Sequence, residues 1–223
     1  LQNREVADIQ LKQLKKVLDL AGNGGYKVVA AKVISQGSST SFTQTITIDA
    51  GTTSGVFTNM TVLSGYGLVG VVKYAYANSA LVQLASDPAF KIGARIARSE
   101  QIAILSGQGT RKGLLQLLDN SSEIKKGDVL LARGSQKGRP FVPGVPIGEV
   151  ISVSNSPGAL TETAEVKFYT NFSTLGVVAV VVSEPRSDPR DALVPSKPQP
   201  TPIPTVTIYA TPGADTPSPA ATN

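Results

Sequence analysis

The chain has 223 residues, of which 41% are apolar, and its formal charge is +5. That length and apolar content suit one or two domains with substantial cores. Cysteine and histidine are both absent, which excludes disulfides, thiolate chemistry, histidine-based catalytic triads and histidine metal sites. The positive charges are spread along the chain rather than clustered, so the sequence does not predict a nucleic-acid partner.

Residues 1–22 are predicted to form one helix, which a glycine-rich turn ends. Its apolar residues are spaced by alternating steps of four and three, as along the a and d positions of a coiled coil: Ala7, Leu11, Leu14, Leu18 and Ala21. Two interpretations are open. Leu11, Leu14 and Leu18 form the seam of a homodimer, or the helix packs against its own domain.

From residue 26 to residue 183 the chain reads as all-β, because short segments rich in β-branched residues follow one another without a long helical period. Turn signals such as Asp87-Pro88 and Lys126-Gly127-Asp128 separate these segments. This pattern predicts antiparallel barrels or sandwiches. The expected strands are 27–34, 43–48, 59–64, 67–75, 80–85, 90–97, 101–107, 113–118, 128–132, 146–154, 162–168 and 176–183.

The last segment, 184–223, differs in composition from the rest of the chain, since it holds ten prolines together with many threonines and alanines. Proline lacks a backbone donor and favours the polyproline II conformation. We therefore expect a Pro/Thr-rich, extended and largely unpacked tail.

The segment GYGLVGVV (65–72) has glycines spaced as in a dinucleotide-binding loop. Such a loop opens a helix, whereas the residues that follow Gly70 here are β-rich. We interpret these glycines as positions where strands bend and pass close to one another. The spacing of Ser122 and Lys125 resembles a penicillin-recognising serine site, but a Lys-Gly-Asp turn follows at once and the companion motifs are missing. We expect no catalytic residue, cofactor or metal.

Four longer motifs, taken in order, resemble the MreC family of rod shape-determining proteins over residues 1–183. They are TITIDAGTTSGVFTNMTVLSGYGLVGVV (45–72), LVQLASDPAFKIGARI (81–96), ILSGQG (104–109) and IKKGDVLLARGSQKGRPFVPGVPIGEVISV (124–153). Within these motifs, eleven residues carry the resemblance, and we expect them to have structural roles in the barrels. They are Gly51, Gly55, Gly67, Leu68, Val69, Gly70, Gly127, Asp128, Pro143, Gly144 and Gly148. The chain departs from the family pattern at Val71, where a basic residue is usual, and at 132–134.

The resemblance implies a coiled-coil helix followed by two small β-barrels on the extracytoplasmic side of the cell membrane. A single transmembrane helix upstream of this chain would anchor it. The strand count agrees with two six-stranded antiparallel barrels, because twelve strands are expected. We assign 43–108 to a barrel inserted into a second one, which is formed by 24–36 and 110–183.

The resemblance also implies a non-catalytic scaffold of the cell-elongation complex that makes peptidoglycan. Such a scaffold maintains cell shape by binding, positioning and activating a class B penicillin-binding transpeptidase. Its further partners would be other elongation-complex membrane proteins and a second copy of itself, in a homodimer or a filament. Two alternatives stay open: a periplasmic adaptor subunit of an export machine, and a wall-associated binding domain with affinity for glycan.

Overall fold

The computed structural model describes residues 2–37, 43–118, 123–154, 162–185 and 187–195. They form one long helix, α1 (Gln2–Asn23), and twelve strands. The strands are β1 (Lys27–Gln36), β2 (Thr45–Ile48), β3 (Thr61–Ser64), β4 (Gly67–Ala75), β5 (Ala80–Leu84), β6 (Lys91–Ile96), β7 (Ile102–Gly107), β8 (Lys112–Leu117), β9 (Val129–Ala132), β10 (Pro146–Ser154), β11 (Thr163–Phe168) and β12 (Val177–Ser183).

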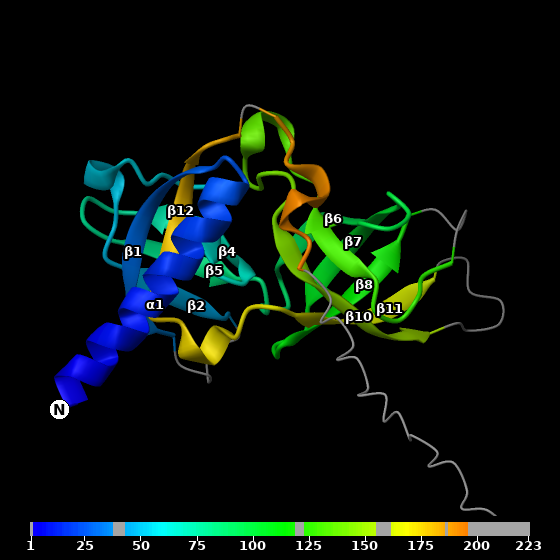
Figure 1. Cartoon of the computed structure of the whole chain (residues 1–223), viewed down its shortest axis with the longest axis horizontal. Helices are drawn as coiled ribbons and strands as arrows, with labels where there is room; N and C mark the ends of the chain where they lie inside the picture. The colour runs from blue at the N-terminus through cyan, green and yellow to red at the C-terminus, as the bar shows by residue number, and fades with distance from the viewer. Residues whose placement is uncertain (1, 38–42, 119–122, 155–161, 186, 196–223) are drawn as a thin grey trace, which may run out of the picture.

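The strands close into two antiparallel barrels that lie side by side, with α1 laid across the first of them (Figure 1). Barrel A has the strand order β1-β12-β3-β4-β5-β2, and barrel B has the order β10-β11-β8-β7-β6-β9. The prediction of two closed six-stranded antiparallel barrels behind an N-terminal helix is confirmed. Closure pairs every strand on both sides, which leaves neither barrel with a free edge.

The predicted division of strands between the barrels is wrong. Strands β6 and β7, which we assigned to one barrel with 43–85, belong instead with β8 to β11. The inserted barrel therefore spans 91–168, and β1 to β5 close with β12. The number of strands alone could not decide which strands form the inserted barrel, because a run of six consecutive strands can begin at β2 or at β6.

The chain passes from barrel A to barrel B at Asp87, a fully buried residue between β5 and β6. Its carboxylate accepts hydrogen bonds from the backbone N–H of Gln44 at 2.6 Å, from the N–H of Ala89 at 2.7 Å and from the side-chain amide of Gln83 at 3.2 Å. A buried carboxylate is tolerated when it has such donors. Asp87 thus fixes the crossover, which the sequence marked only as a turn.

Helix α1 packs its C-terminal half onto barrel A. Val17 and Ala21 are buried there, and Leu14 is half-buried against the same core. The carbonyl of Ala21 accepts the backbone N–H of Tyr26, which reverses the chain into β1. The C-terminal half of α1 therefore packs against its own domain, as the second of the two interpretations predicts.

The described part of the predicted tail is packed rather than extended. Residues Arg190–Leu193 form a short 3-10 turn, and Leu193 is buried. Asp191 lies 3.0 Å from the guanidinium of Arg95 in β6, and Pro189 lies against Gly144. The expectation of an extended tail is therefore wrong for 187–195, because apolar and charged side chains anchor it, while 196–223 lies outside the described residues.

Candidate partner-binding surfaces

The glycine motif at 65–70 serves close packing, since strand β4 and not a helix follows it. Gly65 lies beneath Lys16 of α1, and Gly70 faces the backbone carbonyl of Gln83. Gly67 has a positive φ of 138°, and a Cβ there would lie 2.1 Å from the carbonyl oxygen of Pro146 in β10. At Gly67 the backbones of the two barrels therefore approach closely enough to exclude a side chain.

The other family-motif residues lie in turns or in the core. Gly51 and Gly55 flank a short 3-10 turn over Thr52–Ser54. Leu68 and Val69, both in β4, are fully buried. The remaining motif glycines are structural too: Gly127 lies in the turn before β9, Gly144 before β10 and Gly148 within β10.

Pro143 joins the barrels through a hydrogen bond, because its carbonyl accepts the Tyr26 hydroxyl at 2.6 Å. Burial, with a smaller contribution from the Asp188 carboxylate, raises the pKa of the Tyr26 phenol. The phenol therefore stays protonated and remains a donor.

Asp128, in the turn before β9, holds Arg98 through two hydrogen bonds of 2.8 and 3.0 Å. It also accepts the backbone N–H of Lys125 at 2.8 Å. Burial alone would raise the pKa of this carboxyl, but the hydrogen bonds from Arg98 and Lys125 outweigh it, so the pKa is lowered. Asp128 is thus a structural ion-pair residue in barrel B.

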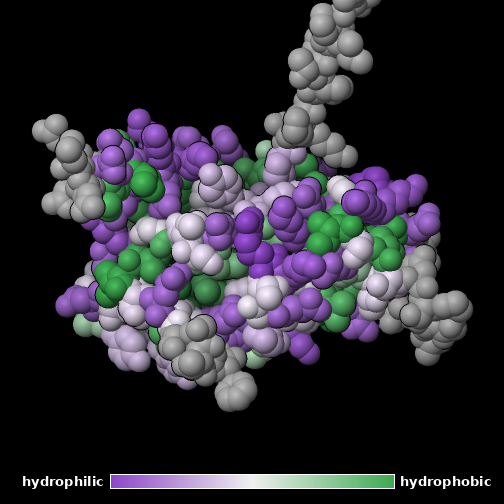
Figure 2. All heavy atoms as spheres, turned by 90° about the horizontal axis from the view of Figure 1, so that it is seen from below, coloured by the Kyte–Doolittle hydropathy of each residue, from purple (hydrophilic) through white to green (hydrophobic). Residues whose placement is uncertain are grey.

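The described residues hold no group of three or more acidic, histidine or cysteine side chains that could bind a metal ion. Within those same residues, no helix combines the length and apolar character that crossing a bilayer requires. The distinctive surface features are instead apolar side chains exposed on rigid elements. Figure 2 shows such side chains in separate patches among hydrophilic ones, over both halves of the molecule.

The first of these surfaces, here called the barrel-B patch, consists of Ile104, Leu114 and Leu118 on and just after β7 and β8. Their exposed fractions are 37%, 42% and 59%. Ile104 pairs with Gln116 and Leu114 pairs with Ser106, so the two apolar side chains are diagonal neighbours on the outer wall. Alternation in β8 explains the exposure, because Leu115 and Leu117 fill the interior.

A second surface, the barrel-A patch, consists of Phe57, Tyr74 and Tyr76, all exposed. Tyr74 lies at the end of β4, and the carbonyl of Tyr76 accepts the N–H of Thr52 from the turn that precedes Phe57.

The helix carries the third surface. Leu11 and Leu18 are exposed by 51% and 47%, whereas Leu14 turns towards barrel A and is half-buried. The structure therefore separates the predicted dimer seam into two exposed leucines and one that contacts its own barrel. The homodimer itself stays a prediction.

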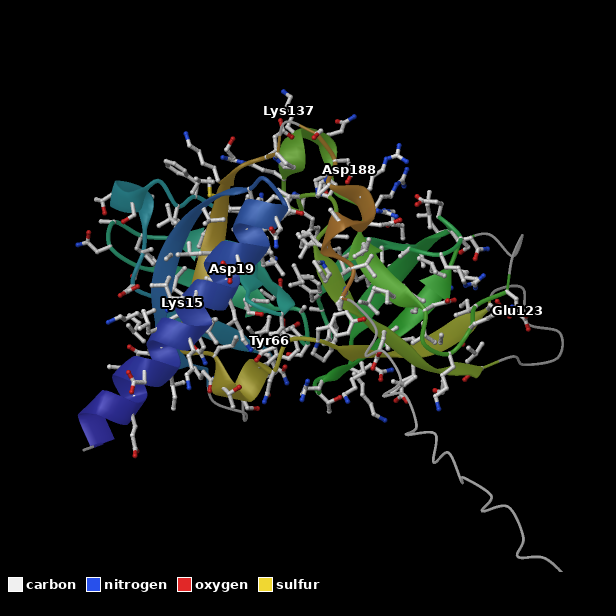
Figure 3. The ribbon with its side chains drawn as sticks, viewed as in Figure 1. Lys15, Asp19, Tyr66, Glu123, Lys137 and Asp188 are labelled. Atoms are coloured by element: carbon white, nitrogen blue, oxygen red, sulfur yellow. The ribbon has the colours of Figure 1, made fainter. Side chains whose placement is uncertain are left out.

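The fourth surface is a hollow of about 480 Å³ between α1 and the rim of barrel A, here called the α1 groove. Tyr66 forms part of its wall, and Lys16 donates to the Tyr66 hydroxyl at 2.7 Å while lying 4.5 Å from the ring centre. Figure 3 shows Tyr66 beside the helix that carries Lys15 and Asp19. The sequence does not predict this groove, because its walls come from three segments that lie about 50 and about 160 residues apart in the chain.

Comparison with known proteins identifies the family. The family model described as "Rod shape-determining protein MreC, barrel core" matches residues 33–182. The MreC protein of Streptococcus pneumoniae is 30% identical over 176 residues, which cover 76% of this chain and 64% of the relative. The Listeria monocytogenes MreC is 32% identical over 171 residues, covering 73% of this chain and 57% of the relative. The matched part of the chain thus spans less than two-thirds of each of these curated relatives.

Solved structures agree with this match. One MreC structure superposes with a TM-score of 0.70 at 28% identity, covering 78% of this chain and 98% of that one. The MreC of Helicobacter pylori, solved as a complex with the penicillin-binding protein PBP2, gives a TM-score of 0.55 at 16% identity, with coverage of 70% and 99%. At that identity the likeness shows the fold alone. The match to the family model, which spans most of both barrels, shows that this chain belongs to the MreC family of rod shape-determining proteins.

Proposed function

We propose that this chain is the extracytoplasmic, non-catalytic part of a scaffold that maintains cell shape by binding and positioning a class B penicillin-binding transpeptidase. A single transmembrane helix encoded upstream would hold it at the cell membrane. The observation that carries the proposal is the barrel-B patch, an exposed apolar surface on a rigid closed wall of a family member.

The closed barrels limit how a partner can bind. Because neither barrel has a free edge, a partner cannot add a strand to the sheet and must contact outward side chains. The barrel-B patch provides such a contact. Around it lie exposed Lys91 on the neighbouring strand β6 and an ion pair between Lys112 on β8 and Glu165 on the neighbouring strand β11. An apolar centre with a charged rim is the usual anatomy of a protein interface.

The Helicobacter pylori relative, solved with PBP2, is a precedent for such a partner within this fold. Binding alone does not activate an enzyme. The scaffold activates the transpeptidase only if it binds the active conformer more tightly than the inactive one.

The binding test uses the class B transpeptidase of the same organism and the full chain, with affinity measured by surface plasmon resonance. We expect Leu114→Glu to weaken binding by about 30-fold or more, as for a hot-spot residue worth about 2 kcal/mol. Tyr76→Glu in the barrel-A patch is the matched control and should leave the affinity unchanged. The assignment of the face is wrong if the control weakens binding and Leu114→Glu does not.

We also propose a homodimer through α1, with Leu11 and Leu18 as its seam. Both leucines are exposed on a helix whose other face is already used. The double change of Leu11 and Leu18 to Glu should shift the chain to monomer in analytical ultracentrifugation. Leu14 is left unchanged because it contacts barrel A. A sedimentation coefficient identical to that of the parent would exclude this seam.

A further inference from the structure

The last described segment of the chain, 187–195, is here called the strap. In Figure 1 it is the orange segment that lies between the C-terminal end of α1 and barrel B. Six of its nine residues are exposed and one is buried. Three contacts hold it in place: Leu193 is buried, the ring of Pro189 lies against Gly144, and Asp191 lies 3.0 Å from the guanidinium of Arg95. A segment with so few buried contacts opens more readily than a closed barrel.

Arg95 is the residue of barrel B that the strap covers. Its neighbours in β6, Ala94 and Ile96, fill the barrel interior, so the Arg95 side chain leaves the outer wall. Only 7% of Arg95 is nevertheless exposed. Because Asp191 of the strap lies directly on the guanidinium, release of the strap would open a buried cation to a new partner.

The strap satisfies this guanidinium incompletely. Glu100 and Asp191 both accept from the same nitrogen, Nη1, at 2.8 and 3.0 Å. The other nitrogen, Nη2, is buried and has no hydrogen-bond partner among the described residues. A buried donor without an acceptor costs free energy, and a guanidinium binds a carboxylate best as a fork, with one oxygen on each nitrogen. A carboxylate that bridged Nη1 and Nη2 would therefore bind more tightly than Asp191 does.

The strap also leaves space beside the helix. A hollow of about 380 Å³ is lined by Ala192 and Leu193 of the strap, by Leu20 of α1 and by Tyr66. Ala192 is the smallest of the strap side chains in this lining, and a longer aliphatic side chain at its position would bury more apolar surface. The strap is therefore neither hydrogen-bonded nor packed as fully as its position allows.

We propose that the surface beneath the strap, formed by Arg95 and Gly144 of barrel B and Leu20 of α1, is a binding site for an acidic segment of a partner protein. The partner segment displaces the strap. Its carboxylate bridges Nη1 and Nη2 of Arg95, and an aliphatic residue two positions later takes the place of Leu193. The strap, with Asp191 and Leu193 at this spacing, is the internal version of the ligand. This inference goes beyond the proposed function and depends neither on the transpeptidase nor on the homodimer.

The charges around this strap site limit the ligand to a single carboxylate. Glu100 remains bonded to Nη1 when Asp191 leaves, and Asp19 lines the hollow beside Lys16. A run of acidic residues would be repelled there, whereas one carboxylate between uncharged residues would not. Gly144 adds a steric limit, because a Cβ at this position would lie 2.4 Å from the ring of the strap proline, so the ligand must pass close to the backbone.

The experiment adds the ligand to full chains whose own strap has been released. Leu193→Asp removes the buried anchor, and Asp191→Lys repels Arg95 without touching the core, while circular dichroism checks that both variants are folded. The probe is a fluorescein-labelled peptide with the strap sequence SDPRDALVP. We expect fluorescence anisotropy to show binding to both opened chains. Binding to the parent should be weaker by about tenfold or more, because its own strap competes at a high effective concentration.

Changes in the peptide and in the protein test the individual contacts. Asp191→Asn in the peptide, and Arg95→Lys added to the Leu193→Asp chain, should each weaken binding by about tenfold, because neither pair can form the charged fork. Ala192→Leu in the peptide should strengthen binding by about tenfold, because it fills the hollow. Leu114→Asp in the parent adds the same charge on the exposed wall of barrel B, and this matched control should bind the peptide no better than the parent does.

Displacement is measured in the parent chain. An excess of the Ala192→Leu peptide should speed hydrogen exchange at 187–195 and leave exchange in β6 unchanged, and unchanged exchange at 187–195 would overturn the proposal. So would a peptide that binds neither opened chain although both are folded, equal binding to the parent and the opened chains, or binding that Arg95→Lys does not alter.

Discussion

The two barrels have the same number of strands but differ in how their walls are used. In barrel A, β3 is buried along its whole length and β4 along its first six residues, so both faces of these strands are covered. In barrel B, β8 alternates strictly between exposed and buried residues. Helix α1 and barrel B itself cover barrel A, whereas the outer wall of β7 and β8 faces solvent.

This difference indicates a division of roles. Barrel A is the central part of the molecule, because it contacts both α1 and barrel B. Helix α1 in turn contacts the packed turn at 190–193. Barrel B is the part whose wall is free to bind a partner. Substitutions should therefore be costly on both faces of β4 but on only one face of β8.

The largest effect is expected for Leu68→Ala in β4. Leu68 is fully buried, so its truncation leaves a cavity and lowers the free energy of unfolding by about 3–5 kcal/mol. Urea unfolding followed by circular dichroism measures this change. Leu114→Ala on the exposed wall of β8 is the control and should cost less than about 0.5 kcal/mol. Similar losses at both positions would show that the walls are not used differently.

The next largest loss of stability is expected for a substitution at the contact between the barrels. Gly67→Ala forces a side chain into a positive-φ position against the Pro146 carbonyl, and we expect a loss of about 2–3 kcal/mol in the same urea assay. Gly93→Ala is the matched control, because a Cβ at Gly93 in β6 would meet nothing within 4 Å. A neutral Gly67→Ala would mean that the barrels separate without cost.

Acid should also lower the stability of barrel B, because it protonates the Asp128 carboxylate. The pKa of this carboxyl is lowered in the folded state, so its stabilisation is present above the unfolded value of about 4 and is lost as the pH falls through the folded value. Asp128→Asn should cost about 1–2 kcal/mol at neutral pH and make the urea midpoint less dependent on pH below about 4. The exposed Asp8→Asn serves as the control, and an unchanged acid dependence in Asp128→Asn would contradict the assignment.

The smallest effect concerns the turn at 190–193, which joins barrel B to the helix. Asp191→Asn removes one of the two carboxylates that face the buried guanidinium of Arg95, and an exposed partner of this kind contributes about 0.5–1 kcal/mol. We expect faster hydrogen exchange at 190–193 with little change in global stability, and a weaker effect at high salt. Glu100→Gln removes the other carboxylate and should leave exchange at 190–193 unaltered.

Local patterns in the sequence predicted most of the fold. β-branched runs, alternation and turn residues located all twelve strands, and the glycine spacing at 65–70 was correctly separated from a nucleotide loop. The long-range pairings could not be predicted this way. The predicted division placed 24–36 and 176–183 in one barrel, where β1 does pair with β12, but it put β6 and β7 in the wrong barrel because no local pattern specifies their partner strands. The buried Asp87 read as an ordinary turn residue, because its donors come from separate segments.

The candidate surfaces were less predictable than the fold. The heptad spacing grouped Leu11, Leu14 and Leu18 into one seam but could not show that Leu14 faces its own barrel, since a helix packed on a sheet has nearly the same period as a coiled coil. The α1 groove depends on Gln13 reaching the loop before β12, a contact with no local signature. The barrel-B patch follows from alternation once the inward face of β8 is known.

The insertion of barrel B into barrel A also sets the order in which the two barrels can close during synthesis of the chain. Barrel B uses one continuous stretch, 91–168, and can close as soon as that stretch is complete. Barrel A cannot close before β12 has been synthesised. Until then, β1 and β3 have unpaired backbone groups that could pair with a strand of a neighbouring chain. The nascent protein is therefore most prone to aggregate when its inserted half is already native, and a helper that shields open strand edges would act in that interval.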